Sequence, residues 1–139
     1  MARAQLAKEL FCIAPDETGL LGRVTAAMAL EGVYIVHLCC YSAEGKGYLQ
    51  TVVREPEKAK KAIGYFIPQI EERDVLVVEF ENKQGTLAPV AKLLGQNRIH
   101  VRYCYGTSGD GFKIVGVFST SDNLKARDLI NEDSQSLGV

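Results

Sequence analysis

One unit of sequence occurs twice in this chain, and the repeat limits the possible folds more than any other feature. The stretches TGLLGRVTAAM and QGTLAPVAKLL set Gly19 against Gly85, 66 positions apart. At this offset the copies align without a gap over residues 10–63 of the first copy. Repetition at a fixed period indicates that one supersecondary unit is built twice. We therefore predict two units in tandem, residues 1–72 and residues 73–139.

Each copy predicts the same first elements. A strand-like run, residues 8–14 in the first copy and 75–80 in the second, ends at a turn with glycine. The next segment has apolar residues at the i, i+3 and i+7 spacing of one helix face. These positions are Leu21, Val24 and Met28 in the first copy and Leu87, Val90 and Leu94 in the second. The stripe predicts a helix that covers a sheet.

The rest of the sheet follows in both copies. Runs rich in β-branched and aromatic residues flank glycine turns, which is typical of hairpins. A second helix is expected from about residue 55 and from about residue 121, where proline or capping side chains suit a first turn. The strands of the two hairpins are residues 33–42 and 47–53, then 99–108 and 112–119.

This order predicts an α+β fold made of two tandem ferredoxin-like βαββαβ units, each an antiparallel sheet with both helices on one face. Residues 66–70 are the possible fourth, edge strand of the first copy. Its counterpart would fall in EDSQSLGV, a poor strand sequence, so we expect that end to be frayed or completed by another element. Units this small need cover for the other sheet face, which favours an intimate two-unit body and a homodimer.

Charge and hydropathy exclude several classes of partner. The 139 residues include 16 Lys and Arg and 17 Asp and Glu, for a net charge of −1. No field of one sign would attract nucleic acid or an anionic membrane. The chain has no 18-residue apolar run, and its first residues lack the apolar core of a secretory signal. We expect a cytoplasmic protein without a nucleic-acid or membrane partner.

The four cysteines show no CxxC spacing, so a zinc site or a disulfide framework has little support. Cys12, Cys39, Cys40 and Cys104 all lie in apolar, strand-like runs. We expect them to pack as small reduced apolar residues, although Cys12 and Cys39 could meet across neighbouring strands. No metal and no cofactor is predicted.

The glycine turn is the best candidate for a binding site. Glycine permits a positive φ and lets a ligand approach main-chain amides. The helix that begins there offers N–H groups and the positive end of its dipole, which favour a carboxylate or phosphate. Asn82, beside the second turn, has both a donor and an acceptor, so it could hold the carboxylate and the ammonium of an amino acid.

These residues carry a resemblance to a known family. ENKQGTL at residues 81–87, the apolar helix after it and IHV at residues 99–101 resemble the ACT domain, an amino-acid-sensing regulatory module with a ferredoxin-like fold. The first copy, with DETGLL at residues 16–21 and GVYI at residues 32–35, is similar. The resemblance covers about residues 6–131, as a tandem ACT protein without a catalytic domain.

The resemblance implies an amino acid bound at an interface between ACT units, and a non-catalytic regulatory role. It also implies the ligand-binding residues. These are Asn82, Gln84, Gly85, Thr86, Leu87 and His100 in the second copy, and Asp16, Thr18, Gly19, Leu20 and Tyr34 in the first. Two positions depart from the family pattern, because Asp16 would repel a carboxylate and His100 replaces a common asparagine. The second copy is therefore expected to be the better site.

Three alternatives stay open at this stage. An adaptor role would leave both sites empty and act through dimerisation on a partner protein, such as a biosynthetic enzyme, a transporter or a regulator. Catalysis would need a constellation that His37 and Cys39, on one strand face, provide only in part. RNA binding is suggested by Lys46-Gly47-Tyr48, but Gln50 stands where a base-stacking aromatic residue is needed.

Overall fold

The computed structural model describes residues 2–108 and 111–137. Over these residues it shows an α+β fold, with a six-stranded antiparallel sheet in the order β2-β3-β1-β4-β6-β5 and four helices. The strands are β1 (Arg3–Pro15), β2 (Ile35–Ala43), β3 (Lys46–Val53), β4 (Gln69–Glu81), β5 (Val101–Ser108) and β6 (Lys113–Thr120). The helices are α1 (Leu20–Leu30), α2 (Pro56–Ile63), α3 (Leu87–Gln96) and α4 (Asn123–Leu137).

The chain divides into two compact units that share two long strands. One unit is Lys8–Arg73, here called the first unit, and the other joins Met1–Ala7 to Asp74–Val139, here called the second unit. The division falls inside β1 and inside β4, each of 13 residues. The predicted boundaries, 1–72 and 73–139, therefore differ from this division chiefly in the N-terminal segment.

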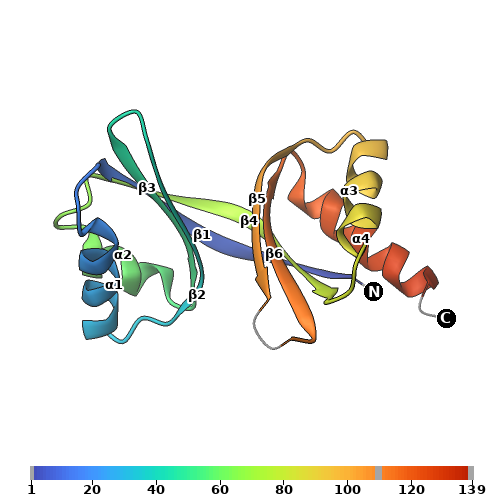
Figure 1. Ribbon diagram of the computed structural model, residues 1–139, viewed down its shortest axis with the longest axis horizontal. Coiled ribbons are helices and arrows are strands. Elements are labelled where there is room, and N and C mark those ends of the chain that lie inside the picture. The colour runs from blue at the N-terminus through green and yellow to red at the C-terminus, as the bar shows by residue number, and fades with distance from the viewer. Residues whose placement is uncertain (1, 109–110, 138–139) are drawn as a thin grey trace. The chain divides into compact units, whose positions relative to one another are not determined.

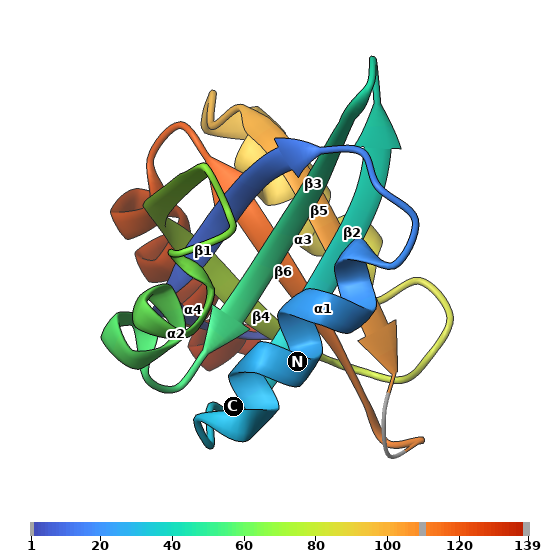
Figure 2. The same cartoon turned by 90° about the vertical axis from the view of Figure 1, so that its left-hand side faces the viewer.

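In the first unit, β1 has β3 and β4 as neighbours and β2 forms the edge. Helices α1 and α2 lie together on one face of these strands (Figures 1 and 2). The β2–β3 hairpin closes through Glu44 and Gly45, whose φ angles of 52° and 77° match the two-residue turn that suits strand twist. The fully buried Leu10, Met28 and Ile63 form the centre of its core, to which the sheet and both helices contribute.

The second unit has the strand order β1-β4-β6-β5, with α3 and α4 on one face (Figure 1). Its edge beside β4 is the N-terminal part of β1, which takes the place that EDSQSLGV does not fill. The side chain of Asn131 fixes this segment, since its Oδ1 accepts from the Ala4 N–H at 2.8 Å and its Nδ2 donates to the Ala4 carbonyl at 3.0 Å. EDSQSLGV itself continues α4 as far as Leu137, and its last two residues lie outside the described part of the chain.

The repeat shifts by one residue at the second hairpin. Cys12 pairs with Leu49 in the first unit, and Val78 pairs with Gly116 in the second. The offset between equivalent residues is thus 66 before the hairpin turn and 67 after it. The ungapped register is wrong beyond the turn, because it aligned Leu49 with Val115. A one-residue shift reverses which strand residues face the helices, so the comparison of sequences had assigned the wrong residue to the core side.

The second helices follow the same corrected offset. Ala59 and Ile63 are fully buried in α2, and Ala126 and Ile130 occupy the matching places in α4 with 0% and 1% exposure. Leu129, which the ungapped register aligned with Ile63, is only partly buried beside the core.

The apolar stripe on the first helix of each copy is confirmed at two of its three positions. Val24 and Met28 are buried in α1, and Val90 and Leu94 are buried in α3. The first positions are wrong: Leu21 and Leu87 are exposed. In each helix that residue belongs to the opening turn.

The cysteines are all free, but only Cys12 is buried. Cys39 is half-buried, whereas Cys40 and Cys104 are exposed, so the prediction that all four are packed inside is wrong. The exposed pair lies on β2 and β5, the edge strands of their units, where neighbours cover one side only. Cys12 and Cys39 cannot meet, because β3 runs between their strands.

Candidate functional site

The two glycine turns have the backbone conformation that the sequence predicted. Gly19 has φ 91° and Gly85 has φ 81°, and each stands at the start of a helix. A Cβ atom at either position would meet no atom within 4 Å. Glycine is thus required here by the left-handed backbone rather than by crowding.

Hydrogen bonds tie the turn at Gly85 to the β5–β6 hairpin. The Asn82 N–H donates to the Phe112 carbonyl at 2.9 Å, and Asn82 Nδ2 donates to the Gly111 carbonyl at 3.0 Å. Thr86 Oγ1 donates back into the turn, 3.0 Å from the Glu81 carbonyl. The amide of Asn82 retains a second N–H and its oxygen lone pairs, so it can still contact a ligand.

Helix α3 starts directly after this turn. The first N–H groups of an α-helix have no partner inside the helix, and they attract an anion. Pro89 removes one of these donors at the third helical position, so the groups left for a ligand are mainly those of Leu87 and Ala88. Gln84 and Gly85 are exposed beside them. This end of α3 is open to a small carboxylate.

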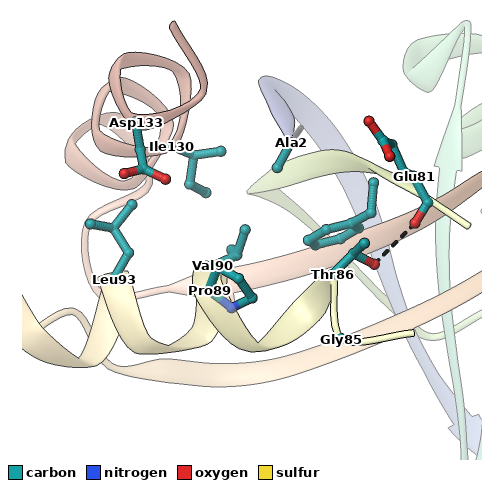
Figure 3. A pocket seen from close by; sticks show the side chains of 10 residues that line it. Ala2, Glu81, Gly85, Thr86, Pro89, Val90, Leu93, Ile130 and Asp133 are labelled. Atoms are coloured by element: carbon teal, nitrogen blue, oxygen red, sulfur yellow. Dashed lines mark hydrogen bonds between the residues drawn. The ribbon is translucent and has the colours of Figure 1, made fainter. Parts of the chain in front are cut away.

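A cavity of about 360 Å³ lies on one side of the first turn of α3 (Figure 3). Apolar side chains from α3 and α4 face each other across it, and two carboxylates, Glu81 and Asp133, stand at its rim. Lys83 forms a 2.9 Å ion pair with Glu81 and, through a hydrogen bond, lowers the pKa of that carboxyl. The lining residues are Ala2, Phe80, Glu81, Gly85, Thr86, Pro89, Val90, Leu93, Ile130 and Asp133.

A second, smaller cavity of about 220 Å³ lies between the start of α3 and the strands of the second unit. We call it the β5–β6 hollow. Sequence reasoning missed it, although glycines inside predicted strands are a signal of close approach or open space. Its lining residues are Phe80, Thr86, Leu87, Cys104, Tyr105, Gly106, Ile114, Gly116 and Phe118.

The structure brings some of the predicted ligand residues of the second copy together and separates one. Gly85 and Thr86 line the larger cavity, and Thr86 and Leu87 line the β5–β6 hollow. Asn82 lies in the adjoining turn. His100 precedes β5, whereas the turn lies at the far end of that strand, roughly 23 Å away at 3.3 Å per residue. One unit alone therefore cannot place His100 and Asn82 on one small ligand.

The predicted residues of the first copy are arranged in the same way, but several have structural partners. Asp16 accepts a 3.0 Å hydrogen bond from the Ser42 hydroxyl, and its N–H donates to the Gly45 carbonyl at 3.1 Å. Leu20 packs against the core of the unit. Tyr34, at the other end of β2, lies under the Arg54 guanidinium, 4.0 Å from the ring centre.

Thr18 and Gly19 are exposed at the turn before α1, as are Asp16 and Tyr34 with the partners just named. The first copy therefore has the backbone turn of the second site, with Leu20 in the place of Thr86 and the hydrogen-bonded Asp16 in the place of Asn82.

The pair His37 and Cys39 has the wrong protonation tendencies for nucleophilic catalysis. Burial raises the pKa of the Cys39 thiol, and Cys40 and Glu9 raise it further. Burial also lowers the pKa of His37. A cysteine nucleophile needs a lowered thiol pKa, commonly beside a charged imidazole.

In the described part of the chain, no group of three or more His, Cys, Asp or Glu side chains is placed to hold a metal ion. None of the helices over the same residues is long and apolar enough to span a membrane.

Several solved structures share this fold. Protein BT0572 from Bacteroides thetaiotaomicron is 26% identical, with a TM-score of 0.85 over 94% of this chain and 90% of that one. The ligand-free regulatory subunit of aspartate kinase from Thermus thermophilus is 12% identical, with a TM-score of 0.69 over 94% and 95% of the two chains.

A putative C-terminal regulatory domain of aspartate kinase from Porphyromonas gingivalis W83 is 11% identical, with a TM-score of 0.57 over 95% and 96%. No family model and no curated protein matches the chain. At these low identities the similarity to the aspartate kinase structures is evidence for the fold alone. On that level they confirm the resemblance to ACT-type regulatory proteins that the repeated glycine turn indicated.

Proposed function

We propose that the protein is a non-catalytic regulatory protein of the cytoplasm that senses a small amino acid. The observation that carries the proposal is the turn at Gly85, which has φ 81° and leads into α3. Asn82 lies in this turn, and two cavities lie beside the first residues of α3. The carboxylate would bind the first N–H groups of α3, and Asn82 would contact the ammonium or the carboxylate. Structures of similar fold that are named as regulatory parts of aspartate kinase support the regulatory role.

A homodimer fits this proposal best. His100 and the turn that contains Asn82 lie at opposite ends of β5. A ligand that contacts both residues therefore needs Asn82 from one protein molecule and His100 from another, so both subunits of a dimer would contribute to the same site. The ligand would shift the population of one arrangement by its differential affinity, with a coupling of about 1–3 kcal/mol. The regulated partner would be an enzyme or another regulator.

The first experiment is a thermal-shift screen of the purified protein against the twenty amino acids, followed by calorimetry on each hit. A ligand at one hundred times its Kd adds about 2.7 kcal/mol to the free energy of unfolding, which raises Tm. Light scattering of the same samples reports whether the ligand changes the fraction of dimer.

Asn82→Ala tests the site itself. We expect at least a tenfold weaker affinity, equivalent to about 1.4 kcal/mol, with little loss of stability because the residue is exposed in a turn. The matched control is Asp16→Ala at the equivalent turn of the first unit, which should leave affinity unchanged. Equal losses of affinity in both variants would show that both units bind the ligand, and unchanged affinity in both would show that neither turn contacts it.

An adaptor without a ligand is the second candidate, and one hydrogen bond favours it. The bond from Asn82 Nδ2 to the Gly111 carbonyl gives this side chain a structural task without any ligand. In that case no amino acid at millimolar concentration changes Tm, while Asn82→Ala still loosens the β5–β6 hairpin.

A further inference from the structure

Two glycines face each other in the β5–β6 hollow. Gly106 and Gly116 are direct partners across the two strands. Cys104 and Phe118 are the next pair on the same side, and Phe118 belongs to the core under the helices. Side chains alternate between the two faces of a strand, so the glycine pair also lies on the helix side. The glycine pair itself therefore presents no side chain to the first turn of α3, although the rings of Phe80 and Phe118 lie against Gly116.

The first unit fills the equivalent place. Its partners across β2 and β3 are Cys40 and Leu49, and Leu49 is only 2% exposed in the core. Leu20 stands where the second unit has Thr86. The comparison shows that the same backbone plan can be packed with two leucines, and that the second unit has a hollow of about 220 Å³ there instead.

The walls of the hollow are apolar. None of the described residues that line it carries a charge. The hydroxyl of Thr86 already donates to main-chain carbonyls of its own turn. A charged or strongly polar group would lose water there without gaining an equivalent partner, whereas an apolar group gains roughly 25 cal/mol for each Å² removed from water.

The size of the hollow limits its occupant. Sites for drug-sized ligands have about 300–1,000 Å³, and this one is smaller. The rings of Phe80 and Phe118 close its floor, because a Cβ at Gly116 would lie 2.8 Å from Phe118 Cε1 and 3.4 Å from Phe80 Cε2. Because an apolar cavity of about 150 Å³ can hold benzene, the hollow can take an apolar amino acid side chain from the size of valine up to a phenyl ring.

We infer that the β5–β6 hollow is a selectivity pocket for an apolar side chain, and that the ligand is an amino acid with a branched aliphatic or a phenyl side chain. Leu87 lines the hollow, and its N–H belongs to the first turn of α3. One ligand can thus place its carboxylate on the helix and its side chain in the hollow that Gly106 and Gly116 line. The inference rests on the proposed function for the carboxylate contact and adds the side-chain contact to it.

The first test measures Kd by calorimetry for alanine, valine, leucine, phenylalanine, aspartate and lysine. Valine, leucine or phenylalanine should bind at least tenfold more tightly than alanine, since one methylene in an apolar pocket is worth about 10–200-fold. Gly116→Ala and Cys104→Leu both narrow the hollow, and either should remove this preference while leaving the Kd for alanine within about twofold.

The matched control is Cys40→Leu, which makes the same change on the exposed edge strand of the first unit and should have no effect. Cys104 is itself exposed, so its replacement keeps the test valid if Gly116→Ala does not fold. Binding with equal affinity for all six amino acids, or a preference that both narrowing variants retain, overturns the inference and leaves the proposed function intact.

The second test needs no amino acid binding. In a Cys39→Ser, Cys40→Ser variant, Cys104 is converted to its methyl, butyl or sulfonatoethyl disulfide with the matching methanethiosulfonates, while Cys12 stays unmodified because it is buried. The butyl adduct should have a higher Tm than the methyl and the sulfonatoethyl adducts. That result with no amino acid hit overturns the proposed function but retains an apolar pocket. Equal Tm values for butyl and sulfonatoethyl adducts overturn the pocket.

Discussion

The two units of this chain have the same order of elements and differ most at one place below the first helix. In the first unit Leu20 and Leu49 fill that place, whereas in the second Thr86 and Gly116 line a hollow whose floor is formed by the rings of Phe80 and Phe118. The glycine turn above it is the same in both, with φ 91° and 81°. Retention of the turn therefore says little about binding, and the difference in side chains is what distinguishes a packed unit from one with room for a ligand.

The largest loss of stability is expected when the packed place in the first unit is emptied. Leu49→Ala removes a side chain that is 2% exposed, and such truncations lower the free energy of unfolding by about 2–5 kcal/mol. Urea unfolding followed by circular dichroism measures the loss. The variant also imitates the second unit, so a loss below about 1 kcal/mol would mean that the first unit tolerates the same hollow.

A smaller effect is expected at the feature that both units share. Gly85→Val places a β-branched residue at φ 81°, which should lower the free energy of unfolding by about 1–3 kcal/mol and weaken ligand binding. Gly95→Ala, inside α3 and with open space around its Cβ, is the control and should raise stability by about 0.5–1 kcal/mol. If Gly85→Val is as stable as wild type, the left-handed turn is absent in solution.

The origin of the fourth strand is the next difference between the units. The first unit uses the start of β4, whereas the second uses residues 3–7, held by Asn131. Asn131→Ala leaves the Ala4 N–H and carbonyl without these partners, which should cost about 1–3 kcal/mol. Hydrogen exchange should become faster at residues 3–7 and stay unchanged in β2 and β3. Faster exchange in both units would show that the two open together.

The smallest effect concerns Cys12, whose equivalent in the second unit is Val78. Burial raises the pKa of the Cys12 thiol from 9.0 to about 12, with a further contribution from Glu9. The unfolded chain then releases this proton first, so stability contributed by the neutral thiol is full below pH 9 and is lost as pH rises towards 12. Cys12→Val should show a shallower decline over this range in urea titrations, and an identical decline would exclude Cys12 as its source.

Local backbone requirements made most of the fold predictable from sequence. The turns at Gly19 and Gly85 need a positive φ, and the helices after them have an apolar period that a sheet must cover. The register of β6 was not predictable, because one residue more between two strands leaves the apolar pattern of each strand unchanged. The hollow at Gly116 depended on that register and on its partner across the strands. The exposure of Leu87 was not predictable either, because an apolar period in the sequence does not show where the core ends.

The division of β1 between the units also has a consequence for synthesis. Residues 8–73 are contiguous, so the first unit has all its strands as soon as β4 has begun to emerge from the ribosome. Residues 3–7 are made earlier still, yet their partners in β4 follow about seventy residues later, at roughly 5–20 residues per second. Residues 3–7 of the nascent chain thus wait for several seconds as an unpaired edge, and the second unit is the one that a pause in translation would expose to aggregation.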